Sequence, residues 1–176
     1  MQNEKALREW CGAAVELVRP SEAKDAPPFA PAYNAYEKWC EMNEGAPPSR
    51  QDLDPMFLGA GLLPYLSIIE VIDEGSDYMW ALVGERIPSI VGTRLTGKRL
   101  SQIEDMIGEP LRFRELLDKV ANETRPVFYT LRHRTTDGRL KRSYGALLPL
   151  RDLPHRDPSH VVVAAILSAS DATTGV

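Results

Sequence analysis

Histidine and carboxylate side chains that could bind a metal occur together at one place in the sequence. His155, Asp157 and His160 lie in a segment rich in proline and aspartate. Imidazole and carboxylate groups suit zinc, but this spacing matches no named zinc site, so we expect a solvated loop and no metal. His133 lies between two arginines on a predicted strand, where a surface position is usual. A pH-sensitive contact to a ligand is the alternative for His133.

The sequence motifs of the common catalytic sites are absent. There is no Gly-x-Ser-x-Gly, Gly-x-x-x-x-Gly-Lys-Ser/Thr, His-Glu-x-x-His or Gly-x-Gly-x-x-Gly. The two cysteines, Cys11 and Cys40, have no metal-ligand spacing and resemble small apolar residues on helix faces. We therefore predict no catalytic residues, and we expect that the protein is not an enzyme.

Basic residues flank Asp137-Gly138, which is the strongest hairpin-turn signal in the chain. This basic hairpin could bind an anionic partner, because rows of like charge across two strands are mildly unfavourable on their own. The alternative, which we favour, is a solvated hairpin that is kept charged against aggregation. The residues concerned are Arg132, Arg134, Arg139, Lys141 and Arg142.

Aromatic and aliphatic residues on predicted strands and short helices could line a pocket for a small molecule. Apolar walls with a few phenolic hydroxyl groups are the usual composition of such sites. Ordinary core packing without a cavity is the alternative, and it is the commoner role of aromatic stripes. The candidate pocket residues are Trp80, Leu82, Ile87, Ile90, Val91, Tyr129, Leu131 and Tyr144.

The composition is that of an ordinary globular protein that folds around one core. The chain has 176 residues, of which 43% are hydrophobic and 26% are charged, and its net charge is −4. A negative charge argues against general binding of nucleic acids, which usually requires a basic domain. The N-terminus shows no signal-peptide pattern, and the longest apolar run, Val161 to Leu167, is too short to span a membrane. We expect a cytoplasmic protein.

The first forty-odd residues predict a helical extension. Leu7, Trp10, Ala14 and Leu17 have the spacing of an amphipathic helix that ends before Pro20. We interpret this helix as an element for dimerisation or signal coupling. A linker and a second short helix, with Tyr33, Tyr36, Trp39 and Cys40 on one face, are expected next. The expected division is an extension over 1–45, a main domain over 46–168 and a flexible tail over 169–176.

From residue 66 the pattern predicts strands and helices in a recognisable order. Two strands come first, followed by short helical turns, a longer helix and three more strands. This order predicts an α+β fold, in which a five-stranded antiparallel sheet carries its helices on one face. The segments are 66–72, 78–84, 85–93, 109–124, 127–135, 140–150 and 161–167.

Short motifs in this part of the chain resemble those of a stand-alone bacterial PAS-like sensor family within the PAS domain superfamily. The order of elements is also similar to the PAS fold: two hairpins, with helices between the second and third strands, and a final strand. The motifs are Pro48-Ser-Arg-Gln-Asp-Leu-Asp-Pro55, Leu63-Pro64, Leu82-Val-Gly-Glu-Arg86, Val91-Gly-Thr-Arg-Leu-Thr-Gly97, Thr124-Arg-Pro126, Asp137-Gly138 and Leu147-Leu-Pro-Leu150.

The resemblance implies a sensory or signalling module that binds a small ligand, a partner protein or both, and it names no cofactor. Flavin photoreceptors of this superfamily need a reactive cysteine, and Arg86 to Leu100 contains none. Haem-binding members need an axial ligand, usually histidine, and Glu109 to Thr124 has no histidine. We therefore expect neither flavin nor haem. A ligand-free adaptor is the second interpretation, and an enzyme resembling ketosteroid isomerase is the third.

Overall fold

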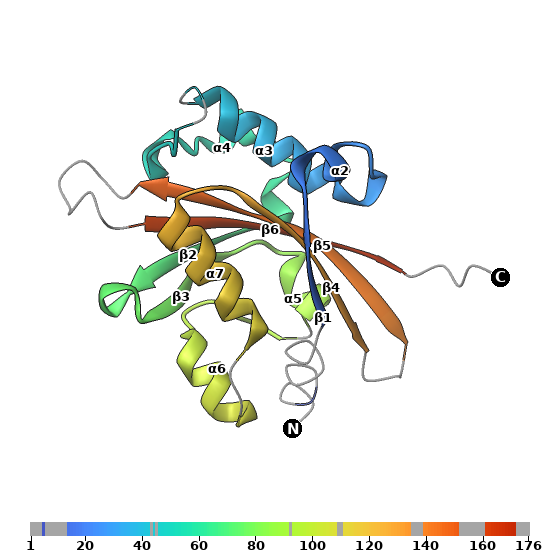
Figure 1. Cartoon of the computed structure of the whole chain (residues 1–176), viewed down its shortest axis with the longest axis vertical. Helices are drawn as coiled ribbons and strands as arrows, with labels where there is room; N and C mark the ends of the chain where they lie inside the picture. Colours follow the sequence, from blue (N-terminus) through green and yellow to red (C-terminus); the bar gives the residue numbers. More distant parts are fainter. Residues whose placement is uncertain are drawn as a thin grey trace.

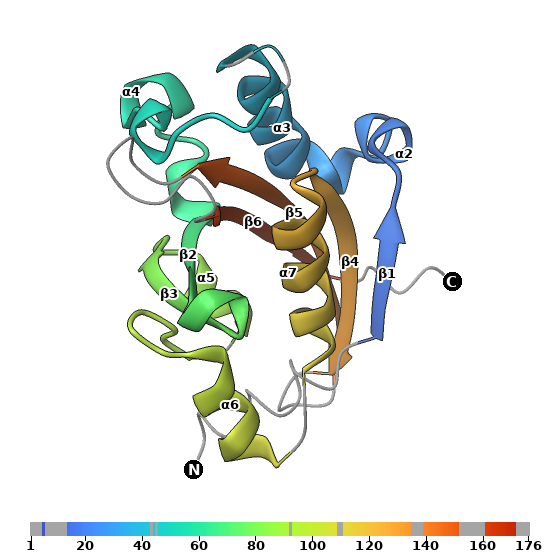
Figure 2. The ribbon, with the colours of Figure 1, turned by 60° about the vertical axis from the view of Figure 1, so that its left-hand side comes forward.

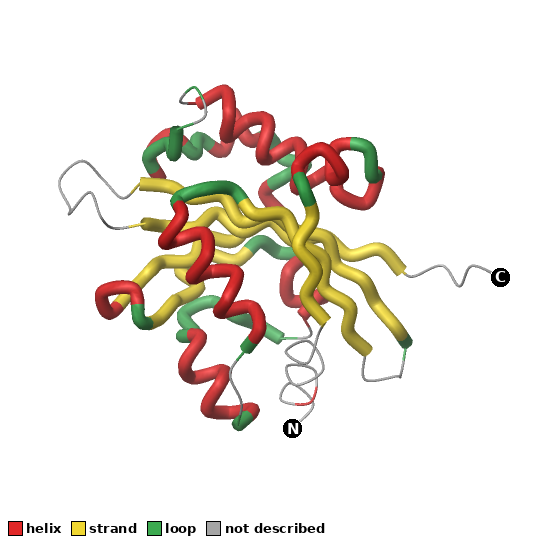
Figure 3. The backbone as a smooth tube through the Cα atoms, viewed as in Figure 1, coloured by secondary structure: helices red, strands yellow, loops and turns green. Residues whose placement is uncertain are grey.

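The computed structural model describes Lys5 and residues 14–42, 44, 46–91, 93–108, 111–134, 139–151 and 161–171. The described residues form one antiparallel sheet of six strands in the order β1-β4-β5-β6-β2-β3 (Figure 1, Figure 3). The last strand in the sequence thus lies between strands of the two hairpins. The strands are β1 (Ala14–Val18), β2 (Leu66–Ile72), β3 (Asp77–Val83), β4 (Val127–Arg134), β5 (Leu140–Arg151) and β6 (Val161–Asp171).

Helices cover both faces of this sheet. Helices α7 and α3 both pack on β5 and β6, but they do so from opposite faces (Figure 1, Figure 2). The helices are α2 (Pro20–Lys24), α3 (Ala30–Met42), α4 (Pro55–Leu58), α5 (Ile87–Val91), α6 (Leu100–Ile107) and α7 (Arg112–Glu123). Single 3₁₀ turns lie at Pro27–Phe29, Arg50–Asp52, Leu63–Tyr65 and Asp73–Gly75.

Alternate residues of the strands supply two hydrophobic cores, because successive side chains of a strand point to opposite faces. The α7-side core lies between the sheet and α5, α6 and α7, and the α3-side core lies on the other face. In β2, Ile69 joins the α7-side core and Ile68 joins the α3-side core. In β4, Tyr129 and Phe128 divide in the same way. Both faces of the central strands are therefore buried.

The expectation that the helices pack on one face of the sheet is wrong. Helix α3, in the region of the second predicted helix, lies on the face opposite α7 and buries Ala32, Ala35 and Trp39. The indole N–H of Trp39 donates a hydrogen bond of 2.8 Å to the carbonyl oxygen of Pro149 in β5. The apolar residues on the second face of the strands need this cover, since they would otherwise be exposed to water.

The prediction of an amphipathic helix before Pro20 is wrong for its last part. Ala14–Val18 is strand β1, which pairs with β4 and makes the sheet six-stranded rather than five-stranded. Leu17 lies opposite Tyr129, and its side chain is 58% exposed. Pairing satisfies the backbone groups along the free edge of β4. Ala14 and Leu17 therefore cannot belong to a dimerisation helix, while Leu7 and Trp10 lie outside the described residues.

Gly84 marks a close approach between the end of β3 and the segment before β2. Its N–H donates to the carbonyl oxygen of Leu66 at 2.7 Å. A Cβ atom at this position would lie 2.4 Å from the carbonyl oxygen of Pro64 and 2.6 Å from that of Leu63. Both neighbours are backbone atoms and cannot rotate away, so only glycine fits here.

The substitution Gly84→Ala is expected to lower the free energy of unfolding by about 2 kcal/mol, as is typical of overpacking. Urea denaturation followed by circular dichroism would measure this change. Gly61→Ala is the matched control, because nothing lies within 4 Å of a Cβ atom there. Its effect should stay within about 0.5 kcal/mol. Equal effects of the two substitutions would contradict the close approach.

Candidate functional site

The structure brings most of the predicted pocket residues together. Six of the eight predicted residues are each at least nine-tenths buried, and all six belong to the α7-side core. They come from β3, α5 and β4, so three separate segments of the chain contribute to one region. The six residues are Trp80, Ile87, Ile90, Val91, Tyr129 and Leu131.

Leu82 does not join this group, contrary to the expectation that it shares a face with Trp80. Ile68 pairs with Leu82 while Ile69 pairs with Trp80, so Ala81 is an extra residue in β3. Such a bulge reverses the alternation of side chains along the strand. Leu82 consequently faces the α3 side, like Ile68, and is 48% exposed. The sequence contains no signal that marks this bulge.

Tyr144 is also on the other face of the sheet. The register of β4 and β5 places Tyr144 opposite Thr130 and places Gly145 opposite Tyr129. The Tyr144 ring contacts Phe29 edge-on, with 5.1 Å between the ring centroids. The prediction that Tyr144 shares a pocket with Tyr129 is therefore wrong by one residue of register, which moves a side chain to the opposite face.

Phe113 of α7 takes the central place among the aromatic residues of the α7-side core. Its ring is stacked with Trp80 at a centroid distance of 6.2 Å and meets Tyr129 edge-on at 5.8 Å. Burial raises the pKa of the Tyr129 hydroxyl, so this group stays protonated at neutral pH. The sequence pattern predicts Phe113 as part of a buried helix stripe, but it does not predict the contact with these two residues.

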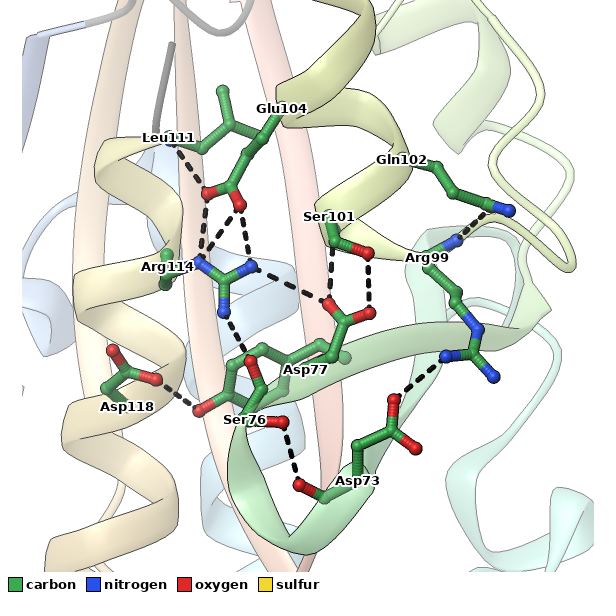
Figure 4. A network of polar contacts seen from close by, with 11 residues as sticks. Asp73, Ser76, Asp77, Arg99, Ser101, Gln102, Glu104, Leu111, Arg114 and Asp118 are labelled. Atoms are coloured by element: carbon green, nitrogen blue, oxygen red, sulfur yellow. Dashed lines mark hydrogen bonds and ion pairs between the residues drawn. The ribbon is translucent and has the colours of Figure 1, made fainter.

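A network of polar contacts joins α7 and α6 to the hairpin of β2 and β3 (Figure 4). Arg114 of α7 is at its centre and forms a bidentate ion pair with Glu104 of α6, in which Nη2 is 2.6 Å from Oε2. Its Nη1 also donates to the carbonyl oxygen of Ser76 at 2.9 Å. A longer ion pair of 3.6 Å joins Arg114 to Asp77. The side chain of Arg114 thus joins α7 to α6 and to the start of β3.

Asp77 and Glu104 are carboxylates that this network holds in the ionised form. Burial alone would raise the pKa of Asp77, but hydrogen bonds from Ser101 and from the Tyr78 backbone, with the Arg114 charge, lower it overall. For Glu104, burial is likewise outweighed by hydrogen bonds from Arg114 and from the Leu111 backbone N–H. Both carboxylates are therefore suited to anchoring helices, and neither has the raised pKa of a general acid.

The network continues to both sides of Arg114. The Tyr78 hydroxyl donates a hydrogen bond of 2.5 Å to Asp118, and burial together with this bond raises the pKa of Tyr78. At the start of α6, Arg99 pairs with Asp73 at 2.8 Å. Asp73 and Glu74 both have positive φ angles, of 50° and 57°, which are uncommon for residues other than glycine. Both partners of this ion pair are exposed, so it connects the turn to the start of α6 but adds little stability.

The basic residues of the predicted hairpin do not share one face of the sheet. Arg132 and Arg142 lie opposite each other on the α3-side face, and Arg132 forms an ion pair of 2.8 Å with Glu16 of β1. Lys141 points to the other face, since it alternates with Arg142 along β5. The predicted patch is therefore not one surface. Arg139 is exposed, while the side chain of Arg134 and the turn Asp137-Gly138 lie outside the described residues.

The remaining sequence predictions concern a metal and a membrane span. His155, Asp157 and His160 lie outside the described residues, and so does the side chain of His133. Within the residues that the structure describes, no group of three histidine, cysteine, aspartate or glutamate side chains could hold a metal ion. Among the same residues, we find no helix long and apolar enough to cross a membrane.

Comparison with known proteins agrees with the architecture. A family model described as PAS domain matches residues 29–163. This range begins just before α3 and ends in β6, so it includes the polar network and all of α5, α6 and α7. No curated protein matches the sequence.

The substitution Arg114→Met should lower the free energy of unfolding by about 3 kcal/mol, because it leaves two largely buried carboxylates without their cation. Chemical denaturation at pH 7 would measure the loss. Lys119→Met is the control, since Lys119 pairs with Glu123 on the surface of the same helix. Exposed pairs contribute less than about 1 kcal/mol. A similarly small loss for Arg114→Met would contradict its central role.

Stability should also fall in acid, because the pKa values of Asp77 and Glu104 are lowered in the folded protein. Their contribution is present above the ordinary carboxyl pKa of about 4 and is lost as the pH falls through the folded values. Urea denaturation between pH 7 and pH 3 would record this loss. The Arg114→Met variant should lose less stability over the same interval. Identical slopes for both proteins would show that other carboxylates dominate.

Proposed function

Because the chain belongs to the PAS domain family, we propose that it is a non-catalytic sensory or signalling module that binds a small ligand, a partner protein or both. The family match, which extends over most of the chain, is the observation that carries this proposal. The polar network supports the absence of catalysis. Its buried carboxylate, Asp77, already accepts hydrogen bonds from Ser101 at both oxygens and pairs with Arg114.

We propose that a ligand binds within the α7-side core, between the sheet and the helices that cover it. Trp80, Tyr129 and Leu131 would contact it from the sheet, and Ile87 and Ile90 would contact it from α5. These residues combine apolar walls with a phenolic hydroxyl group, which is the usual composition of a small-molecule site. Leu82 and Tyr144 are excluded from the proposed site, since both lie on the opposite face.

The signal would be a shift between two packings of α6 and α7 against the sheet. Arg114 supports this mechanism because it connects α7 to Glu104 of α6 and to the backbone of Ser76. Any displacement of α7 would therefore also displace the turn between β2 and β3. A ligand must bind the two packings with different affinity to change their populations, and contacts to Phe113 of α7 would provide that difference.

The test compares the protein as purified with the same protein after unfolding in urea, dialysis and refolding. Native mass spectrometry should show a discrete additional mass that the refolded protein has lost. Hydrogen–deuterium exchange should then be faster in α5, α6 and α7 of the refolded protein, whereas α3 on the opposite face serves as the internal control. An unmodified mass with identical exchange would overturn the ligand-sensing proposal and favour the ligand-free adaptor.

A further inference from the structure

The sheet has two outer strands, β3 and β1, and a segment of the chain covers the outer edge of β3. The N–H of Trp80 donates to the carbonyl oxygen of Lys98 at 3.1 Å, and the N–H of Gly97 donates to the carbonyl oxygen of Trp80 at 2.7 Å. Met79 and Arg99 form an antiparallel bridge at the same place. The segment that leads into α6 therefore occupies hydrogen-bonding groups with which another strand could otherwise pair.

The end of β5 is a further stretch of edge, because β5 continues to Arg151 after its pairing with β4 ends at Leu147. Pro149 has no N–H, and its carbonyl oxygen accepts the hydrogen bond from Trp39. The N–H of Arg151 donates to the carbonyl oxygen of Pro48 at 2.9 Å. A proline and contacts from other segments thus close this edge, and proteins commonly prevent pairing between chains in this way.

The outer edge of β1 has no such cover among the described residues. One side of β1 pairs with β4, and no described residue forms a backbone hydrogen bond or bridge with the other side. The strand lies at the margin of the sheet (Figure 2). It contains no proline, glycine or lysine, and its one charged residue, Glu16, is paired with Arg132 of β4. Apart from its short length, β1 therefore has none of the usual devices against edge pairing.

Leu17 is the side chain of β1 that a neighbouring strand would cover. It is 58% exposed, and no other large apolar side chain that the structure describes on a strand is as exposed. It lies opposite Tyr129 and therefore on the α7-side face. Val15 packs against the α7-side core, and Val18 packs against the α3-side core. A strand added at the outer edge of β1 would remove Leu17 from water, which is favourable.

These observations lead us to propose that the outer edge of β1 pairs with β1 of a second copy of the chain. Two copies of one strand that pair antiparallel are related by a twofold axis, which is the commonest symmetry of protein dimers. A second copy fits this edge, because β1 is apolar on both faces except for Glu16, and Arg132 already compensates the charge of Glu16. The two sheets would then be continuous across the interface. The inference concerns a partner protein and does not depend on the ligand site proposed above.

The register of this pair follows from symmetry and charge. Opposite residues point to the same face of a sheet, so in a twofold-symmetric pair one residue lies opposite itself. Centring the pair on Glu16 would place like charges directly opposite each other, which is destabilising. Centring it on Leu17 places Glu16 opposite Val18 of the second copy and Val15 opposite Arg19 of the second copy. The backbone at Arg19 is extended, with φ −74° and ψ 147°, so the pairing can include this residue.

Sedimentation velocity measures the association of the full chain directly. An interface of one short strand pair is smaller than the area of about 1,200 Å² that stable complexes bury, so the dimer should be weak. The mass should rise toward that of two chains between about 10 μM and about 1 mM, the range in which weak interfaces associate. A monomeric mass over this whole range would overturn the proposal.

Two matched variants assign the association to β1. Leu17→Lys should weaken it about tenfold, because it places like charges opposite each other on an edge strand. The fold should tolerate this change at an exposed position, and urea denaturation of the variant would check that. Leu82→Lys is the control, since Leu82 is 48% exposed on β3, the outer strand whose edge is covered. It should associate like the unchanged protein, and an equal effect of both variants would contradict the assignment.

Cysteine cross-linking tests the register. In a chain whose Cys11 and Cys40 are replaced by serine, Leu17→Cys should give a disulfide-linked dimer under mild oxidation. The two Cβ atoms would be about 5 Å apart, which is close enough for a disulfide after small shifts. Glu16→Cys should give none, because its two copies would be offset along the strands. A dimer linked through Glu16→Cys but not through Leu17→Cys would show that the Leu17 register is wrong.

Hydrogen exchange distinguishes a second copy from another segment of the same chain as the cover of β1. Successive residues of a strand direct their N–H groups to alternate sides, so every second amide of β1 faces outwards. These outward amides should exchange fast in dilute protein and become protected at about 1 mM, where the dimer forms. Full protection in dilute, monomeric protein would show that the chain itself covers this edge, and the proposal would fail.

Discussion

The guanidinium group of Arg114 is the constraint on which the arrangement of the helices depends. The helices α6 and α7 follow each other in the sequence, and each has a further polar contact to β3, from Ser101 to Asp77 and from Tyr78 to Asp118. By pairing with Glu104 and reaching the Ser76 carbonyl oxygen, Arg114 fixes the two helices relative to each other and to the sheet. Hydrophobic contacts are not directional, whereas a bidentate ion pair is, so the core supplies stability and Arg114 supplies geometry.

The local pattern of the sequence was sufficient for most of the elements from residue 66 onward. Alternation and β-branched residues located β2 to β6, and the spacing of Phe113, Leu116, Leu117 and Val120 located α7, because both signals depend on neighbouring residues only. The family resemblance predicted from these motifs agrees with the match over residues 29–163. Features that depend only on neighbouring residues could therefore be predicted without a structure.

The errors concern relations between distant segments. The bulge at Ala81 and the pairing of Tyr144 with Thr130 are properties of two strands together, so neither strand shows them alone. Residues 14–18 have a helical spacing, yet the open edge of β4 offers them hydrogen bonds as a strand. Among the described residues, Thr130 and Ser143 bury hydroxyl groups without a partner, which no pattern along a single strand could show.

The position of β6 has a consequence for how the protein is made. The pair β2 and β3 and the pair β4 and β5 touch within the sheet only through β6, which follows both in the sequence. A ribosome therefore completes two hairpins with open edges before the strand that joins them is available. Open edges of this kind invite pairing with other chains. Until β6 is synthesised, the edges of β2 and β5 that it will cover are open to pairing with another chain.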